Sequence, residues 1–282
     1  MKSSKKILTA NSRGFFGIID FTDINVEKPL TYVKLHDSPV IKILAKNELG
    51  GFFSCDKTEI KFSTVFNNEM KEKAKTTLNG VEPVRDIASN GLKLASGHED
   101  KSIKLWDLTR FTKTHSFEAH GSDVTSLDWH PSKAILASGA KDRLLRLWDV
   151  HNNKNICTLF NHTNTVNTIS FNKDCDLFAS AGKDQIVRVF DTRMFKELYQ
   201  LKSHDAEIYS LHWNPHNCGS LVSADITGKI CLWTLPYRLP TDIQLHSASA
   251  YVSCCKFDAR SELMISTSSD KTIRLWEVAG IN

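Results

Sequence analysis

Hydrophobic and polar residues alternate along most of the chain in short runs, which is typical of strands rather than helices. One stretch shows the pattern well, because ICTLF (156–160), TVNTISF (165–171), LFAS (177–180) and IVRVFD (186–191) follow one another. Gly, Asn, Asp and Lys separate these runs, as is usual for turns between antiparallel strands. The pattern therefore predicts a unit of four short strands. No run of about 18 apolar residues occurs, so no transmembrane helix is predicted.

This unit recurs at a nearly constant period. The strings IKLWD, LRLWD, VRVFD, ICLWT and IRLWE carry one aromatic residue each, at steps of 42, 42, 43 and 43 residues. The aromatic residues are Trp106, Trp148, Phe190, Trp233 and Trp276. Backward steps of 43 and then 44 residues from Trp106 reach Ser63 and Ile19, which lie in strand-like segments without tryptophan. We therefore expect seven units, the first two degenerate. A four-stranded unit cannot bury both faces alone, so we expect the units to pack radially about an axis.

Three polar residue types recur at fixed distances before the aromatic residue. A serine lies ten residues before it in five units, and an aspartate lies six residues before it in four. A histidine lies about 28 to 30 residues before it in four units. One complete set is His120, Ser138, Asp142 and Trp148, and a second is His246, Ser266, Asp270 and Trp276. Elsewhere Phe190 has no indole donor, Thr227 stands in place of the aspartate, and residues 78–80 offer no histidine to Trp106.

Over its whole length the chain resembles the WD-repeat β-propellers. The resemblance implies one all-β domain over residues 1–282, a seven-bladed propeller with seven units. It also implies that the tryptophan, serine, histidine and aspartate of one unit together form a hydrogen-bonded structural network. We therefore expect the two units with complete sets to be the best ordered.

Composition and motifs argue against catalysis. The formal charge is only +4, and the seven cysteines contain no C-x-x-C pair, so we expect free thiols in a reducing compartment. Near-copies of one His/Ser/Asp set indicate scaffolding rather than several active sites. The chain contains no Walker loop, H-E-x-x-H, G-x-S-x-G or dinucleotide motif. The sequence predicts a protein that is not an enzyme, with no catalytic residue, cofactor or metal.

Candidate partner surfaces lie in the turns. The turns between the second and third strands carry a basic rim, which would favour phosphates or an acidic partner. The candidate rim consists of Lys57, Lys101, Lys141, Arg143, Lys183, Lys229 and Lys271. Adjacent turns bring Asp37, Glu82, Asp123, Asp205 and Glu207 to the same face, which dilutes its charge.

The opposite face carries three long loops, at 21–29, 66–76 and 235–241. The second is polar and is expected to be a short helix or a mobile loop. The third has two prolines around Tyr237 and Arg238, which suit either an interface anchor or a packed loop. Arg193 ends the string F-D-T-R, which resembles the W-D-x-R signature of propellers that dock on the DNA-damage-binding adaptor of cullin ligases.

A closer resemblance rests on four segments at their spacings: HDSPV (36–40), AHGSDVTSLDWHPSKAILASGAKD (119–142), FDTR (190–193) and LHWNP (211–215). In order they resemble the WD-repeat subunits of the cleavage and polyadenylation factor. The resemblance implies a nuclear role in pre-mRNA 3′-end formation, with a multi-propeller scaffold and a zinc-finger subunit as protein partners and no membrane association. That family reads RNA with a basic arm before the propeller and an early aromatic residue, neither of which is matched here, so direct contact with pre-mRNA stays open.

Two alternatives remain. One is a substrate receptor of a cullin ubiquitin ligase, and the other is a generic WD-repeat adaptor in another RNA-processing, ribosome-biogenesis or transcription complex. The strand pattern also predicts that the first unit, with strands at 5–10, 15–20 and 31–35, lacks its inner strand. The last unit lacks its outer strand, because only six residues follow Trp276. We expect the natural chain to begin upstream, or a partner to supply the missing strands.

Overall fold

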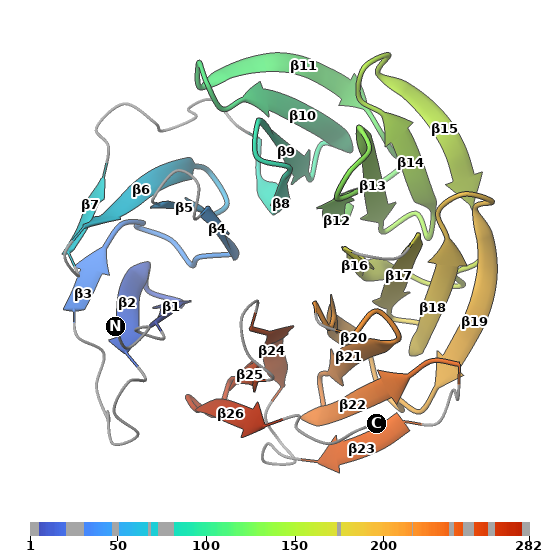
Figure 1. The fold of residues 1–282 in the computed structure, drawn as a ribbon. Helices are drawn as coiled ribbons and strands as arrows, with labels where there is room; N and C mark the ends of the chain where they lie inside the picture. Colours follow the sequence, from blue (N-terminus) through green and yellow to red (C-terminus); the bar gives the residue numbers. More distant parts are fainter. Residues whose placement is uncertain are drawn as a thin grey trace. The chain divides into compact units, whose positions relative to one another are not determined.

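A computed structural model describes most of the chain. The residues described are 6–20, 31–46, 51–66, 69–72, 82–173, 176–215, 217–236, 240–244, 251–258 and 263–277. They form seven small antiparallel sheets (Figure 1), in which each strand pairs with its neighbour in sequence. The predicted fold class is confirmed, because the described residues form an all-β structure with the seven sheets of a seven-bladed propeller. Chain contacts divide the molecule into two compact parts, Met1–Glu118 and Ala119–Asn282. The expectation of one domain stays a prediction.

Three sheets lie in the first part. The first sheet contains β1 (Lys6–Ala10), β2 (Phe15–Asp20) and β3 (Thr31–Lys34). The second contains β4 (Lys42–Lys46), β5 (Gly51–Cys55), β6 (Ile60–Phe66) and β7 (Glu69–Glu72). The third contains β8 (Val84–Ser89), β9 (Lys93–His98), β10 (Ser102–Asp107) and β11 (Thr112–Glu118).

Four sheets lie in the second part. The fourth sheet contains β12 (Val124–Trp129), β13 (Ile135–Ala140), β14 (Leu145–Asp149) and β15 (Lys154–Leu159). The fifth contains β16 (Val166–Phe171), β17 (Leu177–Gly182), β18 (Ile186–Asp191) and β19 (Lys196–Lys202). The sixth contains β20 (Ile208–Trp213), β21 (Ser220–Asp225), β22 (Lys229–Thr234) and β23 (Pro240–Gln244). The seventh contains β24 (Val252–Phe257), β25 (Leu263–Ser268) and β26 (Ile273–Glu277).

The strand count agrees with the sequence at both ends, because the first and seventh sheets have three strands each among the described residues. One expectation is wrong. The polar segment 66–76 contains strand β7, which pairs with β6 from Phe66↔Glu69 to Ser63↔Glu72. An outermost strand packs only one flank against its sheet, so it needs little apolar sequence and escapes a search for alternating hydrophobic residues. Within the described residues, no helix long and apolar enough to cross a membrane is present.

The recurring aromatic residue of the third strand faces one residue of the second strand in every regular sheet. Trp106 pairs with Leu94, Trp148 with Leu136, and Trp233 with Leu221. In the fifth sheet Phe190 pairs instead with Phe178, and their rings stack at a centroid distance of 4.9 Å. Ser63 occupies the corresponding position of the second sheet, opposite Phe52, so the backward count of 43 residues is confirmed.

The hydrophobic core lies between consecutive sheets. One cluster joins Val187 and Val189 of the fifth sheet to Trp213 and Trp233 of the sixth. Equivalent clusters join the fourth sheet to the fifth, the sixth to the seventh, and the first three sheets in pairs. Because each sheet buries its faces only against its neighbours, no single unit folds around a core of its own.

Polar side chains also bridge the first strands of neighbouring sheets, about one repeat apart. Ser126 Oγ accepts a hydrogen bond of 3.0 Å from the backbone N–H of Ile169, 43 residues later. In the next interface but one, Ser210 Oγ accepts a bond of 2.8 Å from Cys255 N. These hydroxyls satisfy backbone groups that would otherwise be unpaired at a strand edge.

Candidate interaction surfaces

The fourth sheet contains the complete network that the sequence predicts. The Trp148 indole donates a hydrogen bond of 2.8 Å to Ser138 Oγ, which lies 2.7 Å from His120 Nε2. The other ring nitrogen, His120 Nδ1, lies 3.0 Å from a carboxylate oxygen of Asp142. An ionised carboxylate only accepts, so Nδ1–H donates to Asp142 and Nε2 accepts from the serine hydroxyl. The four side chains thus form a continuous chain of hydrogen bonds from the third strand to the turns.

The second complete set is only partly described. Trp276 donates a hydrogen bond of 3.0 Å to Ser266 Oγ in the seventh sheet. Asp270 accepts bonds from the backbone N–H and hydroxyl of Thr272. His246 lies outside the described residues.

The sixth sheet corrects the expectation that Thr227 leaves its network incomplete. His204 Nδ1 lies 2.8 Å from Asp225 Oδ2, and His204 Nε2 lies 2.6 Å from Ser223 Oγ, which also accepts from Trp233. The aspartate comes instead from the last residue of β21, two positions before Thr227. Thr227 is part of the arrangement, because its backbone N–H and hydroxyl both donate to Asp225 Oδ1.

The third sheet corrects the parallel expectation for Trp106. Its indole donates a bond of 2.8 Å to Ser96 Oγ, and Ser96 Oγ lies 2.8 Å from Nε2 of His98. His98 comes from the same strand, and its Nδ1 lies 2.8 Å from the carbonyl oxygen of Glu82. A histidine is therefore present, although no turn before the sheet supplies it. Burial lowers the pKa of His98 to about 4, so this ring is neutral at pH 7.

The network aspartates are held in their ionised form. Burial by itself raises the pKa of Asp142, Asp184 and Asp225, but hydrogen bonds from the network histidine and from neighbouring turn groups outweigh it. The pKa of each carboxyl consequently lies below its usual value. Both carboxylate oxygens of Asp142 and of Asp225 accept hydrogen bonds, and Asp184 Oδ2 contacts His162, so these residues stabilise turns.

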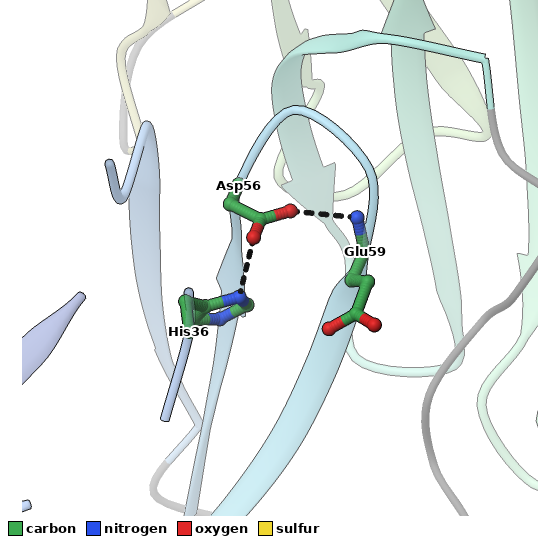
Figure 2. Close-up of side chains that lie close together, drawn as sticks. All are labelled: His36, Asp56 and Glu59. Atoms are coloured by element: carbon green, nitrogen blue, oxygen red, sulfur yellow. Dashed lines mark hydrogen bonds and ion pairs between the residues drawn. The ribbon is translucent and has the colours of Figure 1, made fainter. Parts of the chain in front are cut away.

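Figure 2 shows a group in the second sheet that has the residue types of a metal site. His36 Nδ1 lies 3.2 Å from Asp56 Oδ2, and Glu59 is close by. However, Asp56 Oδ1 accepts from the backbone N–H groups of Thr58 and Glu59, at 2.8 and 2.7 Å. His36 Nε2 lies 2.8 Å from Ser54 Oγ. These are the contacts of the sixth-sheet network, with Asp56 and Thr58 in the places of Asp225 and Thr227, so we interpret the group as another structural network.

The candidate basic rim divides into side chains with different roles. Lys141 forms an ion pair of 2.6 Å with Asp123, and Lys183 one of 3.0 Å with Glu207. In these pairs, acidic residues of the adjacent turns neutralise part of the positive charge of the rim. The remaining exposed members are Lys57, Lys101, Arg143 and Lys271. Three of them, Lys101, Arg143 and Lys271, hold a left-handed backbone conformation, with φ of 70°, 70° and 67°.

Lys229 is not a rim residue in the sense that the sequence suggested. Its Nζ donates a hydrogen bond of 2.6 Å to the carbonyl oxygen of Ser203, the residue before the network histidine. In the fourth sheet Arg146 donates in the same way to the carbonyl oxygen of Ala119, at 2.8 Å. Lys61 does so to Leu35 in the second sheet, also at 2.8 Å. A half-buried cation that anchors the histidine turn is therefore a recurring structural element.

Sequence reasoning missed this recurring cation, although a signal for it exists. Arg146 and Lys61 lie two residues before the aromatic position, and each stands between two apolar residues of its strand. In the sixth sheet Cys231 occupies that position. The cation there is Lys229, which lies two residues earlier on the same strand. A polar residue within an apolar run indicates a satisfied buried group.

At the opposite end of the fifth sheet, Arg193 lies in the turn between β18 and β19. Its side chain is 66% exposed, although it lies 3.2 Å from Asp191 Oδ2 and 3.5 Å from Asp176 Oδ2. The next residue, Met194, is also exposed. The other two candidate partner-binding residues, Tyr237 and Arg238, lie outside the described residues.

Comparison with known proteins agrees with this geometry. A family model described as "WD domain, G-beta repeat" matches residues 72–107, 111–149, 153–191, 195–234 and 239–277. These segments cover more than half of the chain, and each ends with the strand that carries the recurring aromatic residue. No curated protein matches the chain in sequence. On the repeat match, the hydrogen-bonded networks and the seven sheets, the chain belongs to the WD-repeat family.

Proposed function

We propose that this protein is a non-enzymatic scaffold that joins protein partners in the nuclear pre-mRNA cleavage and polyadenylation complex. The general part of the proposal follows from the family, since WD-repeat proteins usually act as protein-interaction scaffolds without catalytic activity. The use of the His/Ser/Asp groups also supports it. In the fourth, fifth and sixth sheets these groups are hydrogen-bonded to one another, which leaves surfaces rather than reactive groups to carry function.

The specific complex is proposed from the sequence alone. The segments 36–40, 119–142, 190–193 and 211–215 resemble the WD-repeat subunits of that factor in order and spacing. The resemblance is not limited to the structural network, because it includes the solvent-exposed Arg193. The expected partners are a multi-propeller scaffold and a zinc-finger subunit, and the expected location is the nucleus.

The exposed turn around Arg193 is the contact that we would test first. Arginine next to an exposed methionine matches the composition of interface anchors, which are enriched in Arg and Met. Asp191 and Asp176 engage one side of the guanidinium, and its 66% exposure leaves the remaining donors accessible to a partner. An acidic or carbonyl-rich surface would complement it.

The test is affinity purification of the tagged protein from its source cells. We expect endonuclease and poly(A) polymerase subunits to co-purify with the wild type, and to be reduced with Arg193→Ala. The matched control is Arg110→Ala, which removes another exposed arginine from the equivalent turn of the third sheet. Unchanged recovery with Arg193→Ala, at a normal melting temperature, would refute the role of this turn.

The second candidate is a substrate receptor of a cullin ubiquitin ligase. The observation that favours it is the string F-D-T-R, which places Arg193 two residues after the end of the third strand, β18. The same purification separates the two candidates. Recovery of a cullin and its adaptor without processing subunits would contradict the leading proposal and support this one. Direct RNA contact is not proposed, because Lys141 and Lys183 are paired with acidic side chains and Lys229 is used internally.

A further inference from the structure

The fourth and fifth sheets share a hollow at the end where the network histidines lie. Its volume is about 280 Å³. The residues around it are Asp142, Arg143 and Leu144 from one turn and Phe160, His162 and Thr163 from the next. A space of this size accommodates one or two side chains of a partner rather than a large ligand.

Phe160 makes this hollow unlike a simple gap between turns. It follows the last residue of β15 directly, and it is 75% exposed. Exposing a phenylalanine forgoes most of the free energy that burial of its side chain would contribute. An isolated exposed apolar residue needs no explanation, but one that borders a concave surface offers a partner an apolar wall.

The polar groups of the floor are already satisfied, so they do not define the occupant. His162 Nε2 lies 2.7 Å from Ser180 Oγ, and its Nδ1 lies 2.8 Å from Asp184. Asp142 contacts His120 and accepts from the backbone N–H groups of Gly121 and Leu144, at 2.9 and 3.1 Å. Recognition therefore depends on Arg143, Thr163 and the apolar wall.

Arg143 gives the hollow its charge preference. It is exposed, and no salt bridge to it is found among the described residues, whereas Lys141 two residues earlier is paired with Asp123. The planar guanidinium binds a carboxylate through two parallel hydrogen bonds. A nucleic-acid strand would require a row of accessible cations, and Arg143 is the only cation among the six lining residues.

We infer that this hollow is a docking site for a partner protein segment in which an Asp or Glu lies a few residues from a Leu, Ile or Phe. The carboxylate binds Arg143, and the apolar side chain packs against Phe160 and Leu144. The inference rests on the proposed scaffold function, for which it names one partner chemistry. It concerns the end of the fifth sheet opposite to Arg193, so the two contacts are independent.

The experiment uses defined fluorescent peptides and the full chain. Each short peptide pairs Glu with Leu at separations of one to four residues in a Gly/Ser background. Matched versions carry Lys in place of Glu, or Ala in place of Leu. Fluorescence anisotropy gives Kd for the wild type, Arg143→Ala and Phe160→Ala, with Arg110→Ala and Leu198→Ala as controls at exposed sites elsewhere.

We expect at least one Glu/Leu peptide to bind about tenfold or more tightly than its Lys version, which corresponds to about 1.4 kcal/mol. Both Arg143→Ala and Phe160→Ala should weaken it about tenfold, while the two controls bind as the wild type does. Added salt should weaken binding too. All four variants should melt as the wild type does, because they change exposed side chains.

Three outcomes would overturn the inference. They are an absence of any peptide preferring Glu over Lys, unchanged binding by both pocket variants, and Arg143-dependent binding of poly(U) RNA without peptide selectivity. The result is distinguishable from the test of the proposed function. Failure of Arg193→Ala to reduce co-purification leaves the peptide measurements unaffected, and loss of peptide binding leaves the purification result standing.

Discussion

The fifth sheet permits a sharp test of how the recurring tryptophan is accommodated. Three other sheets combine a second-strand leucine with a third-strand tryptophan, whereas the fifth combines Phe178 with Phe190. Both phenylalanines are fully buried, and their rings are nearly parallel, with an interplanar angle of 14°. We interpret the pair as a volume exchange, in which one larger and one smaller residue became two of intermediate size.

The exchange predicts strong coupling in a double-mutant cycle. Phe190→Trp alone inserts a larger ring against Phe178, which should cost about 1–3 kcal/mol through overpacking. Phe178→Leu alone leaves a cavity beside Phe190 and should cost about 1–2 kcal/mol. Together they restore the combination of the other sheets. The new indole also gains a partner, because Ser180 donates to His162 and keeps an accepting lone pair, a bond of about 1 kcal/mol.

We therefore expect the double variant to unfold within about 1 kcal/mol of the wild type, with favourable coupling of about 2 kcal/mol or more. Urea unfolding followed by far-UV circular dichroism measures all four proteins, and an unchanged m-value checks that the comparison is valid. In the sixth sheet the reciprocal pair, Leu221→Phe with Trp233→Phe, is the matched control. It should also couple, but should stay less stable than the wild type because Trp233 loses its bond to Ser223. Additivity of the two fifth-sheet changes within about 0.5 kcal/mol would refute the volume exchange.

Three further predictions test the corrected residue roles. Lys229→Ala should lower the free energy of unfolding by about 1–2 kcal/mol, because a backbone carbonyl loses its cationic donor, whereas Lys271→Ala at an exposed turn should change it by less than about 0.5 kcal/mol. Asp225→Asn should cost about 2 kcal/mol or more and Thr227→Ala about 1 kcal/mol, since Asp225 holds both the histidine and the turn; equal losses in urea unfolding would contradict this hierarchy. Burial lowers the pKa of His212 from 6.5 to about 3. As the pH falls below 6.5, the unfolded chain therefore binds a proton at this histidine before the folded protein does. That contribution to stability is complete above pH 6.5 and declines toward pH 3, at up to about 1.4 kcal/mol per pH unit. His212→Asn should make the measured pH dependence shallower, and an identical slope would show that His212 does not titrate in this way.

The errors of the sequence interpretation have a common physical origin. It sought an aspartate four residues after the serine, as in Ser138 and Asp142. In the sixth sheet the aspartate stands only two residues after the serine, yet its carboxylate reaches the same histidine nitrogen. A hydrogen bond requires an atom at the right place, and a turn offers more than one backbone position from which a side chain reaches it. The pattern D-x-T recurs at Asp56, Asp225 and Asp270, so a sequence search could use it to find the aspartate of the turn whatever its distance from the serine.

His98 illustrates the same point for the third sheet. It occupies the position two residues after Ser96 that Asp225 has after Ser223, and it turns its own ring to the serine. Its place within a strand gave no reason to assign it to the network. The sequence also did not predict the exposed hollow at Phe160. Arg143 and Phe160 are 17 residues apart and come together only where two sheets adjoin.

The sequence by itself determined the features that repeat. The period of 42 or 43 residues, the order of the strands within a unit and the pairing of serine with tryptophan all follow from local alternation and fixed offsets. These features are local to one hairpin, and strand geometry translates their spacing directly into position. Only the tertiary structure decided which aspartate or histidine completes each network, and which cations are paired, internal or accessible. Those outcomes depend on side-chain atoms from different turns within a few ångströms of one another, a distance that spacing along the chain does not specify.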